Sequence, residues 1–450
     1  MATKKKTLWN FFDSFEGDKI TWIIVLLLIM FSVVCLFSAT PRLAIQGDTS
    51  RLDIIKEHFF VIALGLGLII LCYNIKSLNF FRRASKCGFA VSFVLLAILD
   101  LKLNLGFIRA SSINGAYRVL VILGQQLHVF EVVKVAMVMY LAWAMEAYNK
   151  DDLKWGRNKK EKLAIYVFAP MLLIFLMVLP GSNTSALLIG AVMLMTIIFG
   201  GVKLKGILIA GASLVICCGG VLLVHKISGK SFGRLDTAIS RIFDNTDWEK
   251  EYQRAREEGD RVRMQEALDE LRQGVGAKIA IKEGKVFGKG PGQSTQRYVV
   301  PAISEDYMLS FIIEEYGVLV GLFVIILYIS LLARSSIIVN NCAKEPFAQL
   351  AVAGLTVLIS GQALIHILVN ADLGVMTGQT LPLISKGNTA FLAFSLAFGI
   401  ILSMSRMAYR GIEKDTKNAD PLMEYTGKGA EENNREDELN ALDRFESEID

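Results

Sequence analysis

Long apolar runs dominate this chain and restrict it to one kind of fold. About ten runs are long enough, at roughly 20 residues each, to cross the hydrocarbon core of a bilayer as helices. They cover residues 20–40, 57–75, 84–101, 125–147, 163–180, 183–201, 206–226, 306–333, 347–370 and 381–408. With 53% hydrophobic residues and a mean hydropathy of +0.46, the chain is too apolar for a soluble enzyme. The sequence therefore predicts an all-α polytopic integral membrane protein.

Polar segments between these runs divide the chain into five parts. We expect a cytoplasmic tail at 1–19, transmembrane helices 1–7 at 20–226, a large extracytoplasmic loop at 227–305, transmembrane helices 8–10 at 306–410 and a disordered cytoplasmic tail at 411–450. Disorder is predicted for the last part because it is polar, acidic and poor in aromatic residues. Within the large loop, residues 247–273 mix acidic and basic side chains, which indicates one or two solvated helices interrupted at Gly259.

The distribution of Lys and Arg predicts which side each segment faces. An even number of spans places both termini on one side, and cytoplasmic segments carry the excess of basic residues. The N-terminal tail and the turns at 76–86 and 150–162 are richer in Lys and Arg than alternate loops such as 371–380. Both termini are therefore predicted to be cytoplasmic, and the net charge of +5 reflects topology rather than a nucleic-acid partner. The six cysteines show no metal-like spacing and indicate neither a disulfide nor a zinc site.

A glycine-rich loop leads into an acidic residue at the outer end of a predicted span. Three glycines and a proline within 288–292 give this loop unusual backbone freedom, and the chain then enters a helix near Asp306. A carboxylate at the boundary between water and lipid is costly unless it is paired or used, so Asp306 is a candidate functional residue. The alternative is that Ser304 or Asp306 only caps the helix, because Ser and Asp are favoured at helix N-termini.

Two charged side chains fall inside the fourth predicted span. Glu131 and Lys134 are three residues apart, so they lie on one face of the helix. Lys134 is predicted to lie about 14 Å into a span that starts near Gln125, at 1.5 Å per residue. Ionisable groups at such a depth often mark a substrate path. The alternative is an internal ion pair that only orders the helix bundle.

A polar stripe and an irregular loop characterise the end of the ninth predicted span. Gln362, His366 and Asn370 recur every four residues and end at the external side. The segment 374–388 then places a proline and several glycines at membrane depth. This indicates a broken segment that faces a cavity, since irregular backbone is not tolerated against lipid. Lys386 is the only cation of this segment.

Six short motifs, taken in order along residues 20–410, resemble the SEDS family, which comprises FtsW, RodA and SpoVE. The motifs are Asn-Gly-Ala-Tyr-Arg ending at Arg118, Glu-Val-Val-Lys ending at Lys134, Gly-Lys-Gly-Pro-Gly-Gln-Ser ending at Ser294, Glu-Asp-Tyr at 305–307, Glu-Glu-Tyr-Gly at 314–317, and Gly-Gln-Thr-Leu-Pro-Leu-Ile-Ser ending at Ser385. The sequence departs from the family pattern at Val119, where Trp is usual, and at 386–388, where Lys-Gly-Asn replaces Tyr-Gly-Gly.

This resemblance implies a peptidoglycan glycosyltransferase of the bacterial cytoplasmic (inner) membrane, which polymerises lipid II at the outer face during cell division or elongation. The implied partners are lipid II, a class B penicillin-binding protein that acts as transpeptidase, and other membrane proteins of the divisome or elongasome. Asp306 is the expected general base for the acceptor hydroxyl. The other expected substrate-binding or cavity residues are Arg118, Glu131, Lys134, Lys289, Ser294, Arg297, Gln362, Ser385 and Lys386.

Positive charge is needed where the pyrophosphate leaves. Arg118, Lys289, Arg297 and Lys386 share the predicted outer side and can supply it, although the sequence does not show that they converge. No acidic ligand cluster indicates a resident metal, which leaves Mg²⁺ or Mn²⁺ as an optional assistant.

Two other functions fit parts of the sequence. A flippase or transporter for a lipid-linked precursor would also use intramembrane polar groups such as Glu131 and Gln362, but the inner halves of these spans are nearly all aliphatic. A catalytically vestigial scaffold of the divisome is the second alternative, because of the departures near Lys386. The sequence does not decide between a role in septum formation and one in cell elongation; a general resemblance to FtsW favours the septal role.

Overall fold

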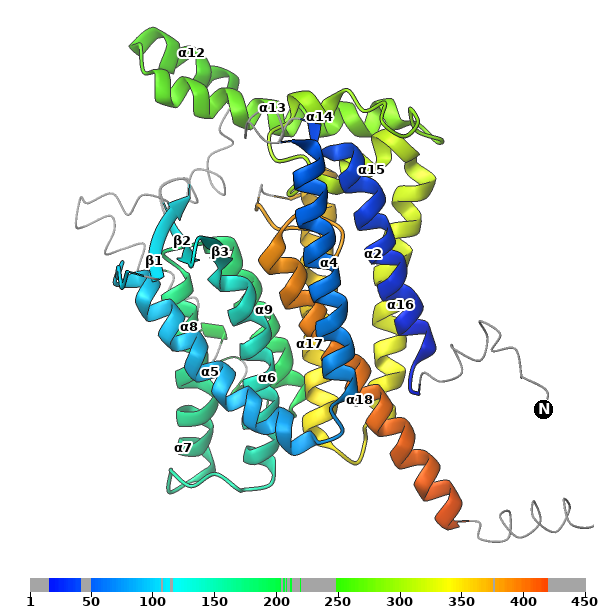
Figure 1. Cartoon of the computed structure of the whole chain (residues 1–450). Coiled ribbons are helices and arrows are strands. Elements are labelled where there is room, and N and C mark those ends of the chain that lie inside the picture. The colour runs from blue at the N-terminus through cyan, green and yellow to red at the C-terminus, as the bar shows by residue number, and fades with distance from the viewer. Residues whose placement is uncertain are drawn as a thin grey trace, which may run out of the picture.

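In a computed structural model, the chain forms a bundle of long helices with a small sheet and a helical extension at one end (Figure 1). The structure describes residues 16–41, 50–203 and 248–419, with gaps at 107, 114–115 and 375–376, and isolated residues between 205 and 219. In chain order the elements are α2 (Lys19–Ala39), α4 (Arg51–Asn74), α5 (Leu78–Asp100), β1 (Ile108–Ile113), β2 (Ala116–Ile122), β3 (Gln125–His128), α6 (Val129–Asn149), α7 (Lys159–Leu163), η1 (Ala164–Phe168), α8 (Ala169–Val178), α9 (Asn183–Phe199), α12 (Trp248–Glu258), α13 (Arg261–Gly284), α14 (Gln296–Val299), α15 (Met308–Tyr316), α16 (Val318–Asn341), α17 (Pro346–Asn370) and α18 (Asn388–Ala419).

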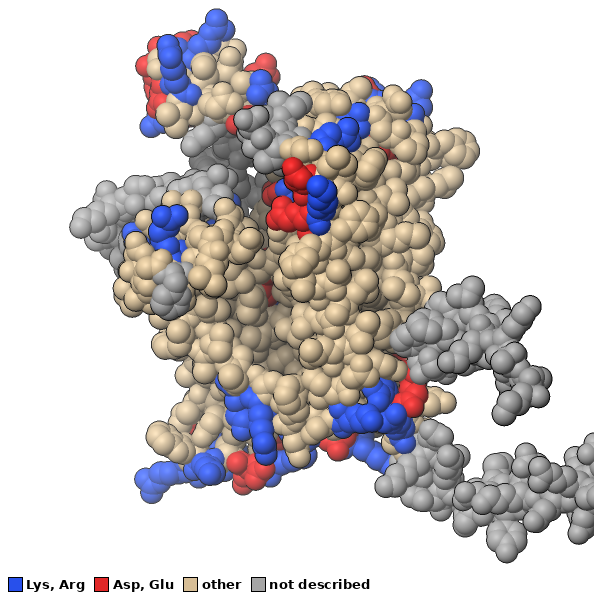
Figure 2. Space-filling view, viewed as in Figure 1, with Lys and Arg blue, Asp and Glu red and all other residues tan. Residues whose placement is uncertain are grey.

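The described residues include six helices that are long and apolar enough to cross a membrane, which confirms the predicted polytopic architecture. They are α2, α4, α16, α17, the α18 stretch Asn388–Ile412 and the continuous stretch Lys159–Val178, formed by α7, η1 and α8. α5 and α6 are of similar length but carry charged residues, and α9 is a shorter apolar helix. A broad band of uncharged side chains separates the charged groups at the two ends of the bundle (Figure 2). The predicted span at 206–226 lies outside the continuously described residues.

Several predicted spans have different bounds in the structure, and the second and third begin six residues earlier, at Arg51 and Leu78. The fourth begins at Val129, because the residues before it form β3. The eighth is broken at Gly317 into α15 and α16, and the tenth begins only at Asn388, after an irregular turn. At 381–385 the apolar residues are buried but form a turn, whereas β3 is mostly exposed, so apolar composition alone fixed neither the helix start nor its burial.

A three-stranded antiparallel sheet in the order β1-β2-β3 occupies the connection between α5 and α6. β2 pairs with β1 through Ile122 opposite Ile108, and with β3 through Val119 opposite His128. Val119 and Leu120 are fully buried, so the sheet is anchored on the helix bundle through β2. The sequence did not predict this sheet, which is the one departure from an all-helical fold among the described residues.

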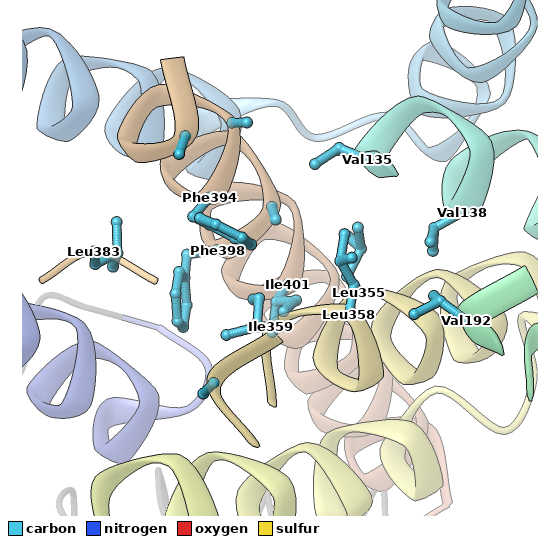
Figure 3. Close-up of a cluster of buried hydrophobic side chains, with 14 of the residues drawn as sticks. Val135, Val138, Val192, Leu355, Leu358, Ile359, Leu383, Phe394, Phe398 and Ile401 are labelled. Carbon is cyan, nitrogen blue, oxygen red and sulfur yellow. The ribbon is translucent and has the colours of Figure 1, made fainter. Parts of the chain in front are cut away.

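α17 and α18 lie in the centre of the bundle. α17 packs against α6, α9 and α16, and α18 packs most extensively against α4. The α4–α18 contact is close because a Cβ at Gly65 would lie 2.6 Å from Phe391, and one at Gly399 would lie 2.9 Å from Cys72. Small residues of this kind let membrane helices approach each other. Side chains that fill the centre are labelled in Figure 3, including Val135, Val138, Val192, Leu355, Leu358, Ile359, Phe394, Phe398 and Ile401.

Candidate active site

Asp306 lies in the turn between α14 and α15, at the end of the bundle that carries the sheet (Figure 1). Its backbone N–H donates to the Ala302 carbonyl over 2.9 Å, and its own carbonyl accepts from Asn370 Nδ2 over 3.2 Å. A Cβ built on Gly378 would lie 3.5 Å from Asp306 Oδ2, so the carboxylate faces that backbone. The N-cap of α15 is Tyr307, without a side-chain cap among the described residues. The backbone thus holds this half-buried residue in place, and its carboxylate does not cap the helix.

Two cations act on neighbouring carboxylates at this turn. Burial, together with the charge of Glu305 and against the opposing charge of Arg118 of β2, raises the pKa of Asp306 to about 7. Burial also raises the pKa of Glu305, against Lys386 and Arg118. Burial lowers the pKa of Arg118, whose Nε has no hydrogen-bond partner among the described atoms. The sheet and the turn before α18 therefore bring two cations to a pair of carboxylates.

Lys134 of α6 is only 2% exposed and is bonded by three acceptors. Its Nζ donates to Glu131 Oε1 over 2.7 Å, to Gln362 Oε1 over 2.6 Å and to Gln379 Oε1 over 3.2 Å. A buried ammonium is tolerated when it is paired and hydrogen-bonded, and these contacts use all three of its N–H groups. Lys134 therefore ties α6 to α17 and to the 377–387 segment beside Asp306.

His366 and Asn370 of α17 extend this network to Asp306. His366 Nδ1 lies 2.8 Å from the Gln379 carbonyl oxygen, and Nε2 accepts from the Leu309 backbone N–H over 3.3 Å. Because a carbonyl only accepts and a backbone N–H only donates, these partners assign the neutral imidazole with its proton on Nδ1. Asn370 binds the Asp306 carbonyl. The polar stripe predicted on the ninth span thus fixes the start of α15.

Lys289, Ser294 and Arg297 contact the buried carboxylates of Glu314 and Glu315, not Asp306, and Lys289 also pairs with Glu283 nearer the surface. Lys289 Nζ donates to Glu314 Oε1 over 2.8 Å, and Ser294 Oγ donates to Glu314 Oε2 over 2.5 Å. Arg297 Nη1 lies 3.8 Å from Glu315 Oε1. The side chains of Glu314 and Glu315 are fully buried. In the structure these three residues hold the glycine-rich loop against α15. The four expected cations therefore form two groups: Arg118 and Lys386 act near Asp306, and Lys289 and Arg297 contact the glutamates of α15.

Gly288 and Gly317 bring the glycine-rich loop and the end of α15 together backbone to backbone. Their φ values are +77° and +91°, a region that favours glycine. A Cβ at Gly317 would lie 2.1 Å from the Val286 carbonyl oxygen. The N–H of Lys289 donates to the Glu314 carbonyl over 2.8 Å, which extends this contact along the loop.

We expect Gly317→Ala to lower the free energy of unfolding by more than about 1–2 kcal/mol, which is the cost of a left-handed backbone alone for a residue with a Cβ. Steric overlap with Val286 adds to that cost. Thermal unfolding in detergent measures the change. Gly67→Ala is the control, because the added Cβ would meet no heavy atom within 4 Å. Equal stability of the two variants would contradict the clamped loop.

Gln362 and Ser385 occupy supporting positions. Besides accepting from Lys134, Gln362 donates through Nε2 to the Thr380 carbonyl over 3.0 Å. Ser385 Oγ accepts from the Leu381 N–H over 2.9 Å and so stabilises its own turn. Sequence reasoning gave no role to Gln379 or Glu305, although each lies inside or beside a motif that had been singled out.

Residues 18–410 match the model of the cell cycle protein family that comprises FtsW, RodA and SpoVE. The chain belongs to this family. It is 29% identical over 427 residues to a probable peptidoglycan glycosyltransferase FtsW of Enterococcus hirae, which covers 90% of this chain and 96% of the relative. It is 25% identical over 391 residues to stage V sporulation protein E of Bacillus subtilis, which covers 86% and 97%.

Solved structures share the fold of this family member. A chain from a peptidoglycan synthase complex that coordinates polymerization and crosslinking superimposes with a TM-score of 0.62, at 19% identity, over 87% of this chain and 98% of that one. The rod shape determining protein RodA of Thermus thermophilus superimposes with a TM-score of 0.57, at 18% identity, over 88% and 99%. The predicted family and polytopic fold are therefore confirmed.

Proposed function

We propose that this peptidoglycan glycosyltransferase polymerises lipid II at the outer face of the cytoplasmic membrane, with Asp306 as general base. The observation that carries the proposal is the placement of Asp306 beside Arg118, in a turn close to the end of the bundle, with its pKa raised to about 7. A base whose pKa lies near the working pH combines a useful fraction of unprotonated carboxylate with real basicity.

The reaction assigns a separate task to each charge. The acceptor hydroxyl attacks the anomeric carbon of the donor sugar, and its proton passes to the Asp306 carboxylate. The bond from that carbon to the pyrophosphate breaks, and the polyprenyl pyrophosphate leaves with the electron pair. Arg118 and Lys386, which both act on Glu305, are the cations available to stabilise the developing negative charge. The network from Lys134 to Asn370 keeps the base in position.

A divalent cation is compatible with this arrangement. No group of three or more His, Cys, Asp or Glu side chains able to hold a metal occurs in the described parts of the chain. Mg²⁺ is often bound through one or two carboxylates together with substrate phosphates, and Glu305 is the carboxylate of this turn that is not assigned as the base. A bound Mg²⁺ or Mn²⁺ would supply positive charge to the leaving group.

The precursor flippase is less well supported. Such a protein needs polar groups through the full thickness of the membrane. Below the Lys134 network, the centre of the bundle is filled by aliphatic and aromatic side chains of α17 and α18, such as Leu358, Phe394 and Phe398 (Figure 3).

An assay with the purified full-length protein and fluorescent lipid II tests the function. It is run with and without a class B penicillin-binding protein, the proposed transpeptidase partner. Glycan strands longer than the substrate, resolved by gel electrophoresis, are the expected product. A protein that only moves labelled lipid II across vesicle bilayers, without forming polymer, would instead be the flippase. Divisome or elongasome membrane proteins are further proposed partners, and the assay does not depend on them.

The rate of polymerisation should increase with pH and level off above about 7. Burial raises the pKa of Asp306 to about 7, so the carboxylate is protonated below that pH and cannot accept the hydroxyl proton. Below the pKa the rate should fall about tenfold for each pH unit. Measuring kcat at saturating lipid II between about pH 5.5 and 9 tests this, and a flat profile would contradict it.

The proposal places both termini and α7 in the cytoplasm and α12 outside. Lys160→Cys and Glu257→Cys, each in a chain without native cysteines, report these two sides. In intact spheroplasts a membrane-impermeant thiol reagent should label position 257 and leave position 160 unlabelled until the membrane is opened. The opposite pattern would reverse the orientation.

A further inference from the structure

A polar cavity lies between the α4–α5 turn and α18. Figure 1 shows this turn at the end of the bundle opposite to the sheet and α15. Its volume is about 490 Å³, which is within the range of roughly 300–1,000 Å³ found for small-molecule sites. Lys76, Arg82, Arg406 and Arg410 line it, with Glu345 as the one lining carboxylate. Arg406 and Arg410 share Glu16, which does not line the cavity, and Arg82 pairs with Glu345 and Glu146, so the four cations exceed their three carboxylate partners by one positive charge.

Two of these arginines are held in place from behind. The Arg406 guanidinium lies 4.8 Å from the centre of the Tyr73 ring, and Nη1 donates to the Tyr73 carbonyl over 2.7 Å. Arg82 donates through Nε and Nη2 to both carboxylate oxygens of Glu146, each over 2.7 Å. Neither Tyr73 nor Glu146 lines the cavity. The cations are therefore positioned in advance, which reduces the entropy lost when a ligand binds.

The remaining lining groups also favour an anion. Lys76 is exposed at the rim and forms no ion pair with the described residues. Glu345 lies 2.8 Å from Arg82, which it shares with Glu146, and Lys150 also offsets the charge of Glu146. The cavity also includes Ser77, the N-cap of the 23-residue helix α5, whose side chain makes no capping hydrogen bond. The first backbone N–H groups of a helix lack intrahelical partners and favour negative charge.

We propose that this cavity binds a phosphate group, presented by the headgroup of an anionic phospholipid in the adjoining leaflet. α4, α5 and α18 end or leave the bundle here, so the cavity opens where lipid headgroups lie, and Lys and Arg side chains gather at this end (Figure 2). Basic pockets at the ends of membrane helices bind such headgroups. A guanidinium pairs with phosphate through parallel hydrogen bonds, and an anionic headgroup is preferred because it lacks the ammonium group that offsets the phosphate charge of a zwitterionic lipid.

The test uses the full-length protein in detergent, titrated with phosphatidylglycerol or phosphatidylcholine and observed by native mass spectrometry. Two variants, Lys76→Gln and Lys76→Gln with Arg410→Gln, remove one and two lining cations. Arg83→Gln is the matched control, because Arg83 is exposed beside Arg82 but does not line the cavity. At about 1 kcal/mol for each basic residue, the dissociation constant for phosphatidylglycerol should rise about fivefold and thirtyfold, and less than twofold in the control.

The source of the phosphate is tested by adding inorganic phosphate as competitor. Displacement of phosphatidylglycerol by phosphate in the wild type, but not in the double variant, supports binding through the headgroup phosphate. Binding of phosphate alone, with no preference for phosphatidylglycerol over phosphatidylcholine, overturns the lipid as its source. Equal weakening by Arg83→Gln and Lys76→Gln overturns the cavity itself, since diffuse charge would then account for binding. Unchanged thermal unfolding of the single variant in phosphatidylcholine shows that it is folded.

Discussion

Lys134→Met should abolish glycan synthesis and lower the free energy of unfolding by about 3–5 kcal/mol, the usual cost of removing one partner of a buried ion pair. Glu131 then loses its cation, and the amide oxygens of Gln362 and Gln379 lose their donor. Because the same ammonium joins α6 to α17 and the turn beside Asp306, both stability and the position of the base should suffer. Chemical denaturation in detergent and the polymerisation assay measure the two effects.

The double variant Glu131→Gln with Lys134→Met separates the functional pair from a purely structural one. Stability should recover only in part, since Gln362 and Gln379 still lack the ammonium, and activity should stay lost. Full activity in the double variant would show that the pair only orders the bundle. Lys150→Met, at the C-cap of the same helix, is the matched control: Lys150 is half-exposed and its partner Glu146 keeps Arg82 as a second cation, so the loss should be at most about 1 kcal/mol.

Hydrophobic patterning predicted most of the spanning helices because the bilayer requires apolar side chains along about 20 consecutive residues. It failed where the chain is buried but not helical. Val119 and Leu120 are as apolar as helix residues, yet they lie in β2. The break at Gly317 was also missed, since the apolar run continues through it and only the approach of the Val286 backbone requires the positive φ.

Local spacing predicted the Glu131–Lys134 pair, because three residues are nearly one turn of helix. Spacing could not predict which carboxylate each of the cations on the predicted outer side contacts. Lys289 and Arg118 are both basic and both lie on the predicted outer side, yet one contacts Glu314 and the other acts on Asp306. That division depends on how the loop folds back on α15, a long-range contact with no signature in a single sequence.

Asp306→Asn should reduce the rate of polymerisation by a factor of order 10²–10⁴, the usual contribution of a general base. The amide keeps the shape of the side chain but cannot accept the hydroxyl proton. The backbone bonds to Ala302 and Asn370 do not involve the side chain, so the turn should keep its structure. Glu305→Gln is the matched control: it removes a neighbouring negative charge and should change the rate far less, with the apparent pKa of Asp306 lowered.

The most direct test measures kcat and lipid II binding together for wild type, Asp306→Asn and Glu305→Gln, each purified at full length. We predict that Asp306→Asn binds lipid II with an affinity within a few fold of wild type and forms almost no glycan. Glycan synthesis by Asp306→Asn within a few fold of the wild-type rate, with binding intact, would contradict the role of Asp306 as the base.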